Sequence, residues 1–132
     1  MTALRSTVLA VDDEPSILQW LTRSLTAHDY SVLTADNTSS AREILTRERV
    51  DAVILDARLV HESGLQILEF VRSIKTLAEL PVIVLTRALQ LTEEEENMIV
   101  QNRAYVFYKP QALAVIAVTL DRLLRRSSER RG

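Results

Sequence analysis

Short apolar runs rich in β-branched residues alternate along the chain with longer segments whose apolar residues recur at helical spacing. The first pattern predicts strands, and the second predicts amphipathic helices that bury one face. The predicted strands span 7–11, 31–35, 52–55, 81–85 and 104–108. The predicted helices run from Pro15, from about Ser39 to Glu48, from near Leu65, from just after Thr92 to about Val100, and from about Gln111 to Arg125.

The third and fourth apolar runs indicate how the strands pair. The run 52–55 is almost purely apolar, which is typical of a strand buried on both faces of a parallel sheet. Pro81 stands at the entry of the next run, where a strand tolerates proline. Strands that alternate with helices imply right-handed crossovers, so the sequence predicts an α/β fold with a doubly wound parallel sheet.

Composition fits one compact domain. The chain has 132 residues, of which 47% are hydrophobic, and this is enough to bury a core at this length. It has no cysteine, which excludes disulfides and thiolate metal sites. Residues 126–132 are polar and end in glycine, so we assign the domain to 1–125 and a flexible tail or linker stub to 126–132.

Neither charge nor hydropathy indicates a nucleic acid or a membrane as partner. The net charge is −2, and the basic residues near the end of the chain are too few to argue DNA binding. Residues 1–6 lack the signal-peptide pattern, and no apolar run approaches the roughly 20 residues that span a bilayer. We therefore expect a soluble, cytoplasmic protein that binds no nucleic acid directly.

Polar residues follow the predicted strands where each one ends. Asp12 and Asp13 follow the first strand, Asp56 the third, Thr86 the fourth, and Lys109 the fifth. Sites in open parallel sheets form at the carboxyl ends of the strands, so we expect these side chains to converge. Alone, each has an ordinary explanation, such as a helix cap or a strand-end hydroxyl; the joint pattern at successive strand ends favours a site.

The chemistry of this cluster favours phosphoryl transfer. Three carboxylates a few ångströms apart repel, and one would bind a proton unless a cation intervened. Carboxylate oxygens suit Mg²⁺, and the ammonium of Lys109 could relieve the repulsion and bind an incoming phosphoryl group. A carboxylate such as Asp56 is a competent nucleophile for forming an acyl phosphate, and the cation and lysine supply positioning and charge neutralisation.

The motifs resemble those of one family, the receiver domains of two-component response regulators (CheY-like receivers). The stretch from Val11 to Pro15 resembles its acidic opening motif, and Asp56 with Gly64 downstream resembles its phosphoacceptor strand and the following turn. Thr86 and the pair Lys109-Pro110 are similar to its remaining signature positions. The resemblance covers roughly residues 5–125, and it implies a flavodoxin-like (βα)5 fold with strand order 2-1-3-4-5.

The resemblance implies a role for each matching residue. Asp56 would accept a phosphoryl group from a phosphohistidine on a histidine kinase or histidine phosphotransfer protein, in a phosphorelay that requires Mg²⁺. Asp13 and Asp56 would bind Mg²⁺ directly, together with the main-chain carbonyl of Arg58, and Asp12 would hold a metal-bound water. Lys109 would pair with the phosphoryl oxygens. The domain would catalyse only its own phosphorylation and dephosphorylation, and so would not be an enzyme in the usual sense.

Two further features would follow from the same resemblance. The peptide bond between Lys109 and Pro110 is expected to be cis. Thr86 would swing toward the phosphoryl group and report its presence.

Departures from the family pattern concern modulation of the switch. Val106 stands where the family usually has the aromatic residue that couples to the threonine. Either Thr86 works with another partner, or a one-residue shift of the strand brings Tyr105 or Phe107 into place. Arg87 replaces a usually small residue, and two interpretations are open. It faces solvent, or, as we hypothesise, it pairs with a pocket carboxylate or the phosphoryl group and slows access.

Two more departures lie in the segment after Asp56. Arg58 stands at a position that faces the entrance, where it could alter the access of water to the acyl phosphate. Val60 replaces a common proline, which predicts a looser loop over 61–63.

The last helix carries more apolar residues than one buried face needs. Ala114, Ala117, Val118 and Leu124 surround its core face. A helix that is apolar on most sides indicates a contact surface, which we place on the fourth and fifth helices and the strand between them. It would serve a homodimer, a kinase or an effector.

Three alternative functions compete with a phosphorylatable receiver. A degenerate receiver would act as an interaction module that needs no phosphorylation, as Val106 and Arg87 suggest. A flavodoxin-like cofactor binder would need a phosphate-binding loop after the first strand, where the acidic run 12–14 would repel phosphate. A haloacid-dehalogenase-like phosphatase would need a second aspartate two residues after the nucleophile, which Glu14 and Pro15 do not supply.

Overall fold

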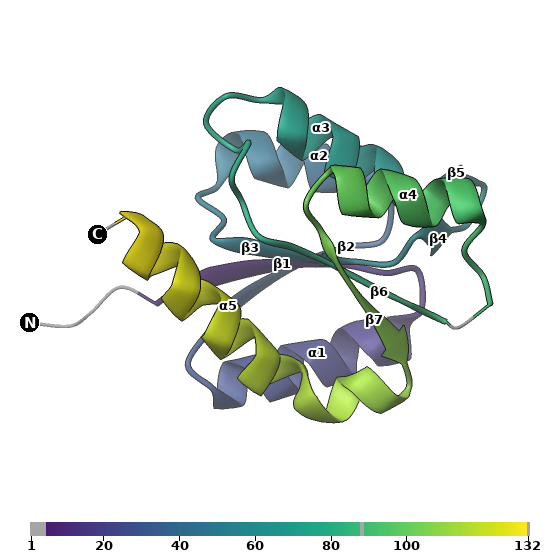
Figure 1. Cartoon of the computed structure of the whole chain (residues 1–132). Coiled ribbons are helices and arrows are strands. Elements are labelled where there is room, and N and C mark those ends of the chain that lie inside the picture. Colours follow the sequence, from purple (N-terminus) through teal and green to yellow (C-terminus); the bar gives the residue numbers. More distant parts are fainter. Residues whose placement is uncertain (1–4, 88, 132) are drawn as a thin grey trace, which may run out of the picture.

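A computed structural model describes residues 5–87 and 89–131, with side chains described to residue 125. Five parallel strands form one sheet in the order β2-β1-β3-β6-β7. Helices α1 and α5 cover one face of this sheet, and α2, α3 and α4 cover the other (Figure 1). The strands are β1 (Thr7–Val11), β2 (Ser31–Ala35), β3 (Ala52–Leu55), β6 (Val82–Arg87) and β7 (Tyr105–Lys109). The helices are α1 (Pro15–Ala27), α2 (Thr38–Arg47), α3 (Leu65–Ser73), α4 (Glu93–Gln101) and α5 (Ile116–Arg131).

The predicted fold class and strand order are therefore confirmed. Counted within the main sheet, the order is 2-1-3-4-5, as in flavodoxin-like folds. Strand β3 is buried along its whole length, as its apolar run predicts. Strand β6 continues past the predicted end at residue 85, because Thr86 and Arg87 still pair with Tyr108 and Lys109 of β7. Hydropathy does not mark this extension, since its residues are polar.

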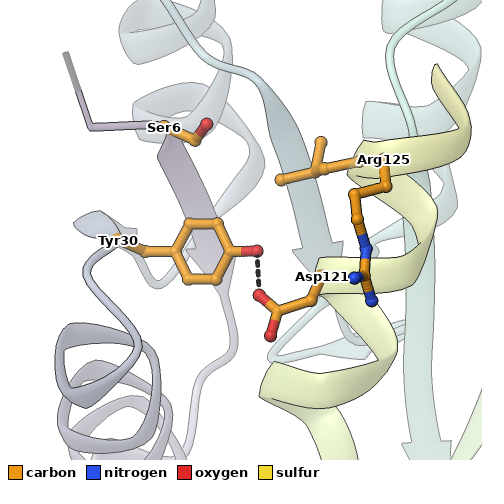
Figure 2. Close-up of a pocket in the computed structure, with 5 residues that line it drawn as sticks. Ser6, Tyr30, Asp121 and Arg125 are labelled. Atoms are coloured by element: carbon orange, nitrogen blue, oxygen red, sulfur yellow. Dashed lines mark hydrogen bonds between the residues drawn. The ribbon is translucent and has the colours of Figure 1, made fainter. Parts of the chain in front are cut away.

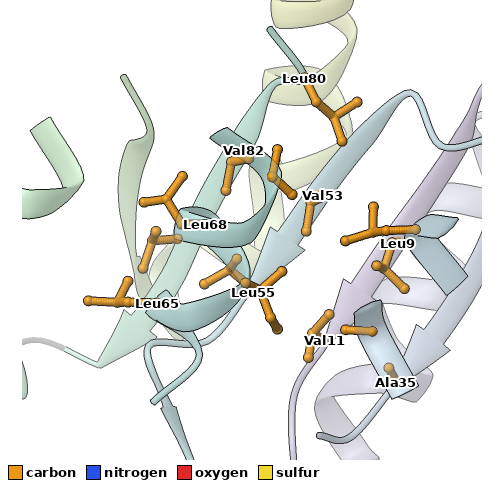
Figure 3. Packing of buried hydrophobic residues seen from close by; sticks show 14 of the residues in the cluster. Leu9, Val11, Ala35, Val53, Leu55, Leu65, Leu68, Leu80 and Val82 are labelled. Atoms are coloured by element: carbon orange, nitrogen blue, oxygen red, sulfur yellow. The ribbon is translucent and has the colours of Figure 1, made fainter. Parts of the chain in front are cut away.

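Alternation along the strands builds a separate core on each face of the sheet. Leu9 and Val53 point toward α2 and α3, where they pack with Leu68 and Val82 (Figure 3). The residues between them, such as Ile54, point toward α1 and α5. This is the two-residue period of a strand covered on both sides. Packing in the two cores fixes the positions of the strands, and therefore also the positions of the residues that follow each strand.

A short hairpin that hydropathy did not predict follows β3. Strands β4 (Arg58–Leu59) and β5 (Glu62–Ser63) pair antiparallel around a turn in which His61 adopts a positive φ of 62°. The Glu62 carboxylate accepts hydrogen bonds from the main-chain nitrogen and hydroxyl of Thr38, at 2.7 and 2.9 Å. The predicted loose loop over 61–63 is thus an ordered hairpin, because Glu62 attaches it to the start of α2.

Helix ends agree with the predictions at α4 and differ at α5. Thr92 caps α4 and forms the full capping box with Glu95. The segment predicted as one helix from Gln111 begins instead as a 3-10 helix, η1 (Gln111–Val115), and the α-helix then continues to Arg131, past the predicted end near Arg125. Gly132 and the side chains of 126–131 lie outside the described residues, so the tail at 126–132 stays a prediction.

At the amino ends of the strands, opposite the predicted site, the segment that follows α1 makes a polar contact with α5. The Tyr30 hydroxyl, just before β2, donates a hydrogen bond to the Asp121 carboxylate on α5 (Figure 2). His28, which ends α1, lies with Nδ1 3.4 Å from the same carboxylate. Burial and the hydrogen bond to Asp121 both raise the pKa of Tyr30.

Within the described part of the chain, no helix is both long and apolar enough to cross a membrane.

Candidate functional site

Four polar side chains are buried at the carboxyl ends of the strands. They are Asp12, Asp56, Thr86 and Lys109, and their residues are at most 5% exposed. The sheet ladder positions the two aspartates, because the main-chain nitrogen of Asp56 donates to the Val11 carbonyl at 3.0 Å. Sequence reasoning predicted this convergence, and the structure brings the four residues together.

The Lys109 ammonium is the centre of the cluster. Its nitrogen lies 2.7 Å from a carboxylate oxygen of Asp12, 2.7 Å from Asp56 Oδ2 and 3.1 Å from Glu14 Oε2. The lysine side chain has no exposed surface. Burial alone would lower the pKa of Lys109, but the hydrogen bonds to Asp12 and Asp56 outweigh it and raise the pKa. Lys109 is therefore a fixed positive charge next to Asp56.

One ammonium does not fully compensate the carboxylates around it. Burial raises the pKa of Asp12 above the ordinary value, although hydrogen bonds from Lys109 and the main chain of Glu14 oppose the rise. The neighbouring charge of Asp56 raises this pKa further. The raised pKa at Asp12 and the raised pKa at Lys109 are consistent, because the cluster holds more negative than positive charge. A bound cation would relieve this excess.

Glu14 belongs to the site, although its place in the acidic motif predicted no role for it. One carboxylate oxygen contacts Lys109, and the other lies 2.7 Å from Nη2 of Arg87. Burial opposes ionisation of Glu14, but the hydrogen bonds and charges of Lys109 and Arg87 together outweigh it and lower the pKa. The signal was available in the uninterrupted acidic run 12–14.

The acidic residues form a donor set that fits a divalent cation. Asp12, Asp13, Glu14 and Asp56 each offer one carboxylate oxygen, and these four atoms all lie within 4.8 Å of one another. Oxygen ligands from one or two carboxylates, completed by water and phosphate oxygens, are what Mg²⁺ prefers. The chemistry and spacing of these side chains are therefore compatible with Mg²⁺.

Both oxygens of Asp56 are engaged. Oδ1 accepts hydrogen bonds from the main-chain nitrogen of Arg58 and from the Thr86 hydroxyl, each at 3.0 Å. Oδ2 accepts from Lys109. The Thr86 hydroxyl thus contacts the Asp56 carboxylate directly. The peptide bond between Lys109 and Pro110 is cis, as expected.

Gly64 is required by a close approach to Asp56. Its φ of −64° is open to any residue, so the backbone conformation does not explain the glycine. A Cβ at this position would lie 1.8 Å from the carbonyl oxygen of Asp56. Because glycine has no Cβ, α3 can begin this close to the main chain of Asp56.

Comparison with known proteins agrees with this geometry. Residues 8–121 match the family described as the response regulator receiver domain. This chain belongs to the receiver domains of response regulators. It is 34% identical over 120 residues to the response regulator MprA of Mycobacterium leprae, which covers 91% of this chain and 51% of that protein. It is also 34% identical over 121 residues to the probable transcriptional regulatory protein TcrX of Mycobacterium tuberculosis, covering 92% and 50%.

Solved structures support the same assignment. The chemotaxis response regulator CheY4 of Vibrio cholerae superposes with a TM-score of 0.80 at 27% identity, covering 90% of this chain and 98% of that one. A CheY-like receiver from Methanospirillum hungatei gives a TM-score of 0.87 at 18% identity, which shows the fold alone. The chain spans about half the length of the two mycobacterial relatives. It is a receiver domain of two-component signal transduction.

Within this receiver, the strand shift considered at position 106 does not occur. Val106 pairs with Val84 of β6 and packs in the core under α3 and α4. Phe107 points to the other core, and Tyr105 is 39% exposed. No aromatic side chain therefore takes the usual position, and the described partner of the Thr86 hydroxyl is Asp56 itself.

The two arginines near the site point in different directions. Arg87 pairs with Glu14 at the edge of the acidic cluster, which agrees with the predicted pairing to a pocket carboxylate. Arg58 was expected to face the entrance, but its guanidinium is bound to the Gln90 carbonyl and the Glu95 carboxylate at the start of α4. A long arginine side chain reaches either way, and the sequence does not indicate which.

Proposed function

We propose that Asp56 accepts a phosphoryl group from a phosphohistidine on a histidine kinase or histidine phosphotransfer protein. The observation that carries the proposal is a buried carboxylate held against a fixed ammonium, inside a cluster with excess negative charge. An Asp56 oxygen would attack phosphorus, the phosphorus–nitrogen bond would break, and the histidine imidazole would leave and take up a proton. Lys109 would neutralise the charge that develops on the phosphoryl oxygens.

Magnesium would be held by Asp13 and Asp56 directly, by Asp12 through water, and by the main-chain carbonyl of Arg58. When bound, it would neutralise charge on the phosphoryl oxygens and orient them. The dense carboxylate donor set supports this assignment. The domain would act on no external substrate beyond its own phosphodonor.

The output of the switch would be the surface of α4, β7 and α5. Exposed apolar side chains lie on each of these elements: Val100 on α4, Tyr105 and Tyr108 on β7, and Val118 on α5. Such a surface supports a homodimer or an effector contact that phosphorylation would regulate. Because the mycobacterial relatives are about twice as long, an effector domain is a natural candidate for this contact.

A degenerate receiver that binds partners without phosphorylation is the competing function. Val106 at the usual aromatic position and the ion pair between Arg87 and Glu14 favour it. The complete set of Asp12, Asp56 and Lys109 at hydrogen-bonding distance favours phosphorylation.

Intact-protein mass spectrometry after incubation with Mg²⁺ and acetyl phosphate separates the two. Acetyl phosphate would transfer its phosphoryl group to Asp56, and acetate would be the leaving group. We expect one added phosphoryl mass, which Asp56→Asn removes. Asp29→Asn is the matched control, because Asp29 is exposed at the other end of the sheet and its φ of 66° suits asparagine. A protein that never gains this mass would be the interaction module instead.

A further inference from the structure

Arg58 contacts the site with its main chain and α4 with its side chain. Its main-chain nitrogen donates to Asp56 Oδ1 at 3.0 Å. Its guanidinium donates to the Gln90 carbonyl from Nε at 3.2 Å and from Nη2 at 2.7 Å, and Nη2 also lies 2.6 Å from Glu95 Oε1. We call Arg58, the Gln90 carbonyl and Glu95 the Arg58–Glu95 clamp. One residue thus links the predicted phosphoacceptor to the beginning of α4.

Glu95 connects the clamp to the helix itself. Its Oε1 accepts both the Arg58 guanidinium and the main-chain nitrogen of Thr92, and the latter bond is half of the capping box. The Glu95 side chain is only 18% exposed, whereas the Arg58 side chain is 46% exposed. Because the same oxygen closes the cap and holds the arginine, a movement of Arg58 acts on the first turn of α4.

Two contacts hold the loop between β6 and α4. One is the hydrogen bond from the main-chain nitrogen of Gln90 to the Arg87 carbonyl at 3.3 Å, and the other is the Arg58 side chain. Leu89 has a positive φ of 70°, which is unfavourable for a leucine, and its side chain is fully exposed. Packing of Leu89 therefore does not stabilise this conformation. The clamp holds the next residue, because the Arg58 guanidinium is hydrogen-bonded to the Gln90 carbonyl. Releasing Arg58 would let this loop relax.

A phosphoryl group on Asp56 would disturb the main chain of Arg58. Both carboxylate oxygens already accept hydrogen bonds, Oδ1 from Arg58 and Thr86 and Oδ2 from Lys109. An oxygen that becomes the bridge of an acyl phosphate loses charge and is a weaker acceptor. The donors must then rearrange toward the new phosphoryl oxygens. Thr86 lies in β6 just before the β6–α4 loop, and the Arg58 guanidinium binds the Gln90 carbonyl within it. Both donors to Asp56 Oδ1 therefore connect to this loop.

We propose that the Arg58–Glu95 clamp is the element that couples the phosphorylation state of Asp56 to the first turn of α4 in this receiver. It rests on the proposed function, since it requires Asp56 to be phosphorylated. The clamp connects Asp56 to α4 through polar groups. Val106 cannot make such a connection, because it is an apolar side chain packed in the core. The connection consists of the Arg58 guanidinium and the Glu95 carboxylate, 2.6 Å apart.

The test compares amide hydrogen exchange of α4 with and without the phosphoryl group, in the whole chain with Mg²⁺ and acetyl phosphate. The phosphoryl mass is measured on the same samples. Glu95→Gln is the decisive variant, because glutamine still accepts the capping hydrogen bond from Thr92 but lacks the charge that pairs with Arg58. Its control is Glu94→Gln, the same change of charge on an exposed residue of the same turn. Arg58→Ala removes the clamp from the other side.

We expect Glu95→Gln and Glu94→Gln to gain the phosphoryl mass as the parent protein does. Because the main chain of Arg58 belongs to the proposed site, Arg58→Ala is compared with the parent at equal phosphoryl mass. The change in α4 exchange on phosphorylation falls about fivefold or more in Glu95→Gln and Arg58→Ala, and it stays full in Glu94→Gln. Faster α4 exchange in both states, with the change on phosphorylation as large as in the parent protein, would indicate a merely structural clamp and would overturn the inference. A full response at the parent's exchange rates in both clamp variants would overturn it as well. Absence of phosphoryl mass in every sample, including the unmodified protein, would overturn the proposed function along with it.

Discussion

Gly64→Ala tests whether the start of α3 positions Asp56. At a φ of −64°, alanine is allowed, and the substitution alone would stabilise the protein by about 0.4–1 kcal/mol through the unfolded chain. The new Cβ would lie 1.8 Å from the carbonyl oxygen of Asp56, a distance at which something must shift, and the atom it meets is main chain. Forced shifts of this kind cost about 1–3 kcal/mol, so the clash outweighs the gain.

The same shift should slow phosphorylation. Relieving the contact moves α3 or the main chain of Asp56 by about 1 Å, and misplacement of a reacting group by about 1 Å costs on the order of 10²-fold in rate. Urea unfolding measures the free energy of unfolding, and a mass time course with acetyl phosphate measures the rate. Gln66→Ala, an exposed change on the first turn of α3, should leave both nearly unchanged. A Gly64→Ala protein that is as stable as the parent and phosphorylated as fast would refute the reasoning.

Three further changes test the surroundings of the site and the core. Arg87→Ala frees Glu14 and should speed phosphorylation by acetyl phosphate up to about fivefold, the size of an exposed ion pair, whereas an unchanged rate would remove Arg87 from any gating role. Lys109→Met leaves buried carboxylates without a counter-ion and should cost about 3–5 kcal/mol in urea unfolding at pH 7. The loss should be smaller at pH 5, because burial raises the pKa of Asp12 and favours its protonated form; an equal loss at both pH values would contradict this. The pKa of Tyr30 is raised in the folded state by burial and Asp121, so the stabilising effect is complete below the unfolded pKa of about 10 and is lost as pH rises above it. The stability of the parent relative to Tyr30→Phe should therefore fall above about pH 10, and a difference independent of pH would contradict the assignment.

The sequence predicted the fold and the centre of the site because both depend on local periodicity. Apolar alternation marks β1 and β3, and a parallel sheet brings the residues after them together at one edge. Periodicity alone therefore places Asp12 and Asp56 side by side, and the pairing of β1 with β3 agrees. The same reasoning placed Lys109 and Thr86 at this edge. Hydropathy predicted the end of β6 at residue 85, but Thr86 still belongs to the strand because it pairs with Tyr108 of β7.

What the sequence did not predict depends on contacts between distant segments. The β4–β5 hairpin is attached to α2 by Glu62 and Thr38, which are 24 residues apart. The direction of the Arg58 side chain depends on a carboxylate 37 residues away. Neither partner can be identified from a periodic pattern. The strand shift considered at Val106 was likewise open until the register of β7 showed that it does not occur.

The proposed function requires Asp56 to take a phosphoryl group from a donor in which phosphorus is bonded to nitrogen. Phosphoimidazole carries that bond in its simplest form, and intact-protein mass spectrometry counts the groups transferred. With Mg²⁺ present, we expect one added phosphoryl group on the parent chain and on Asp29→Asn, and none on Asp56→Asn. No added mass on the parent, or the same added mass on Asp56→Asn, would contradict it.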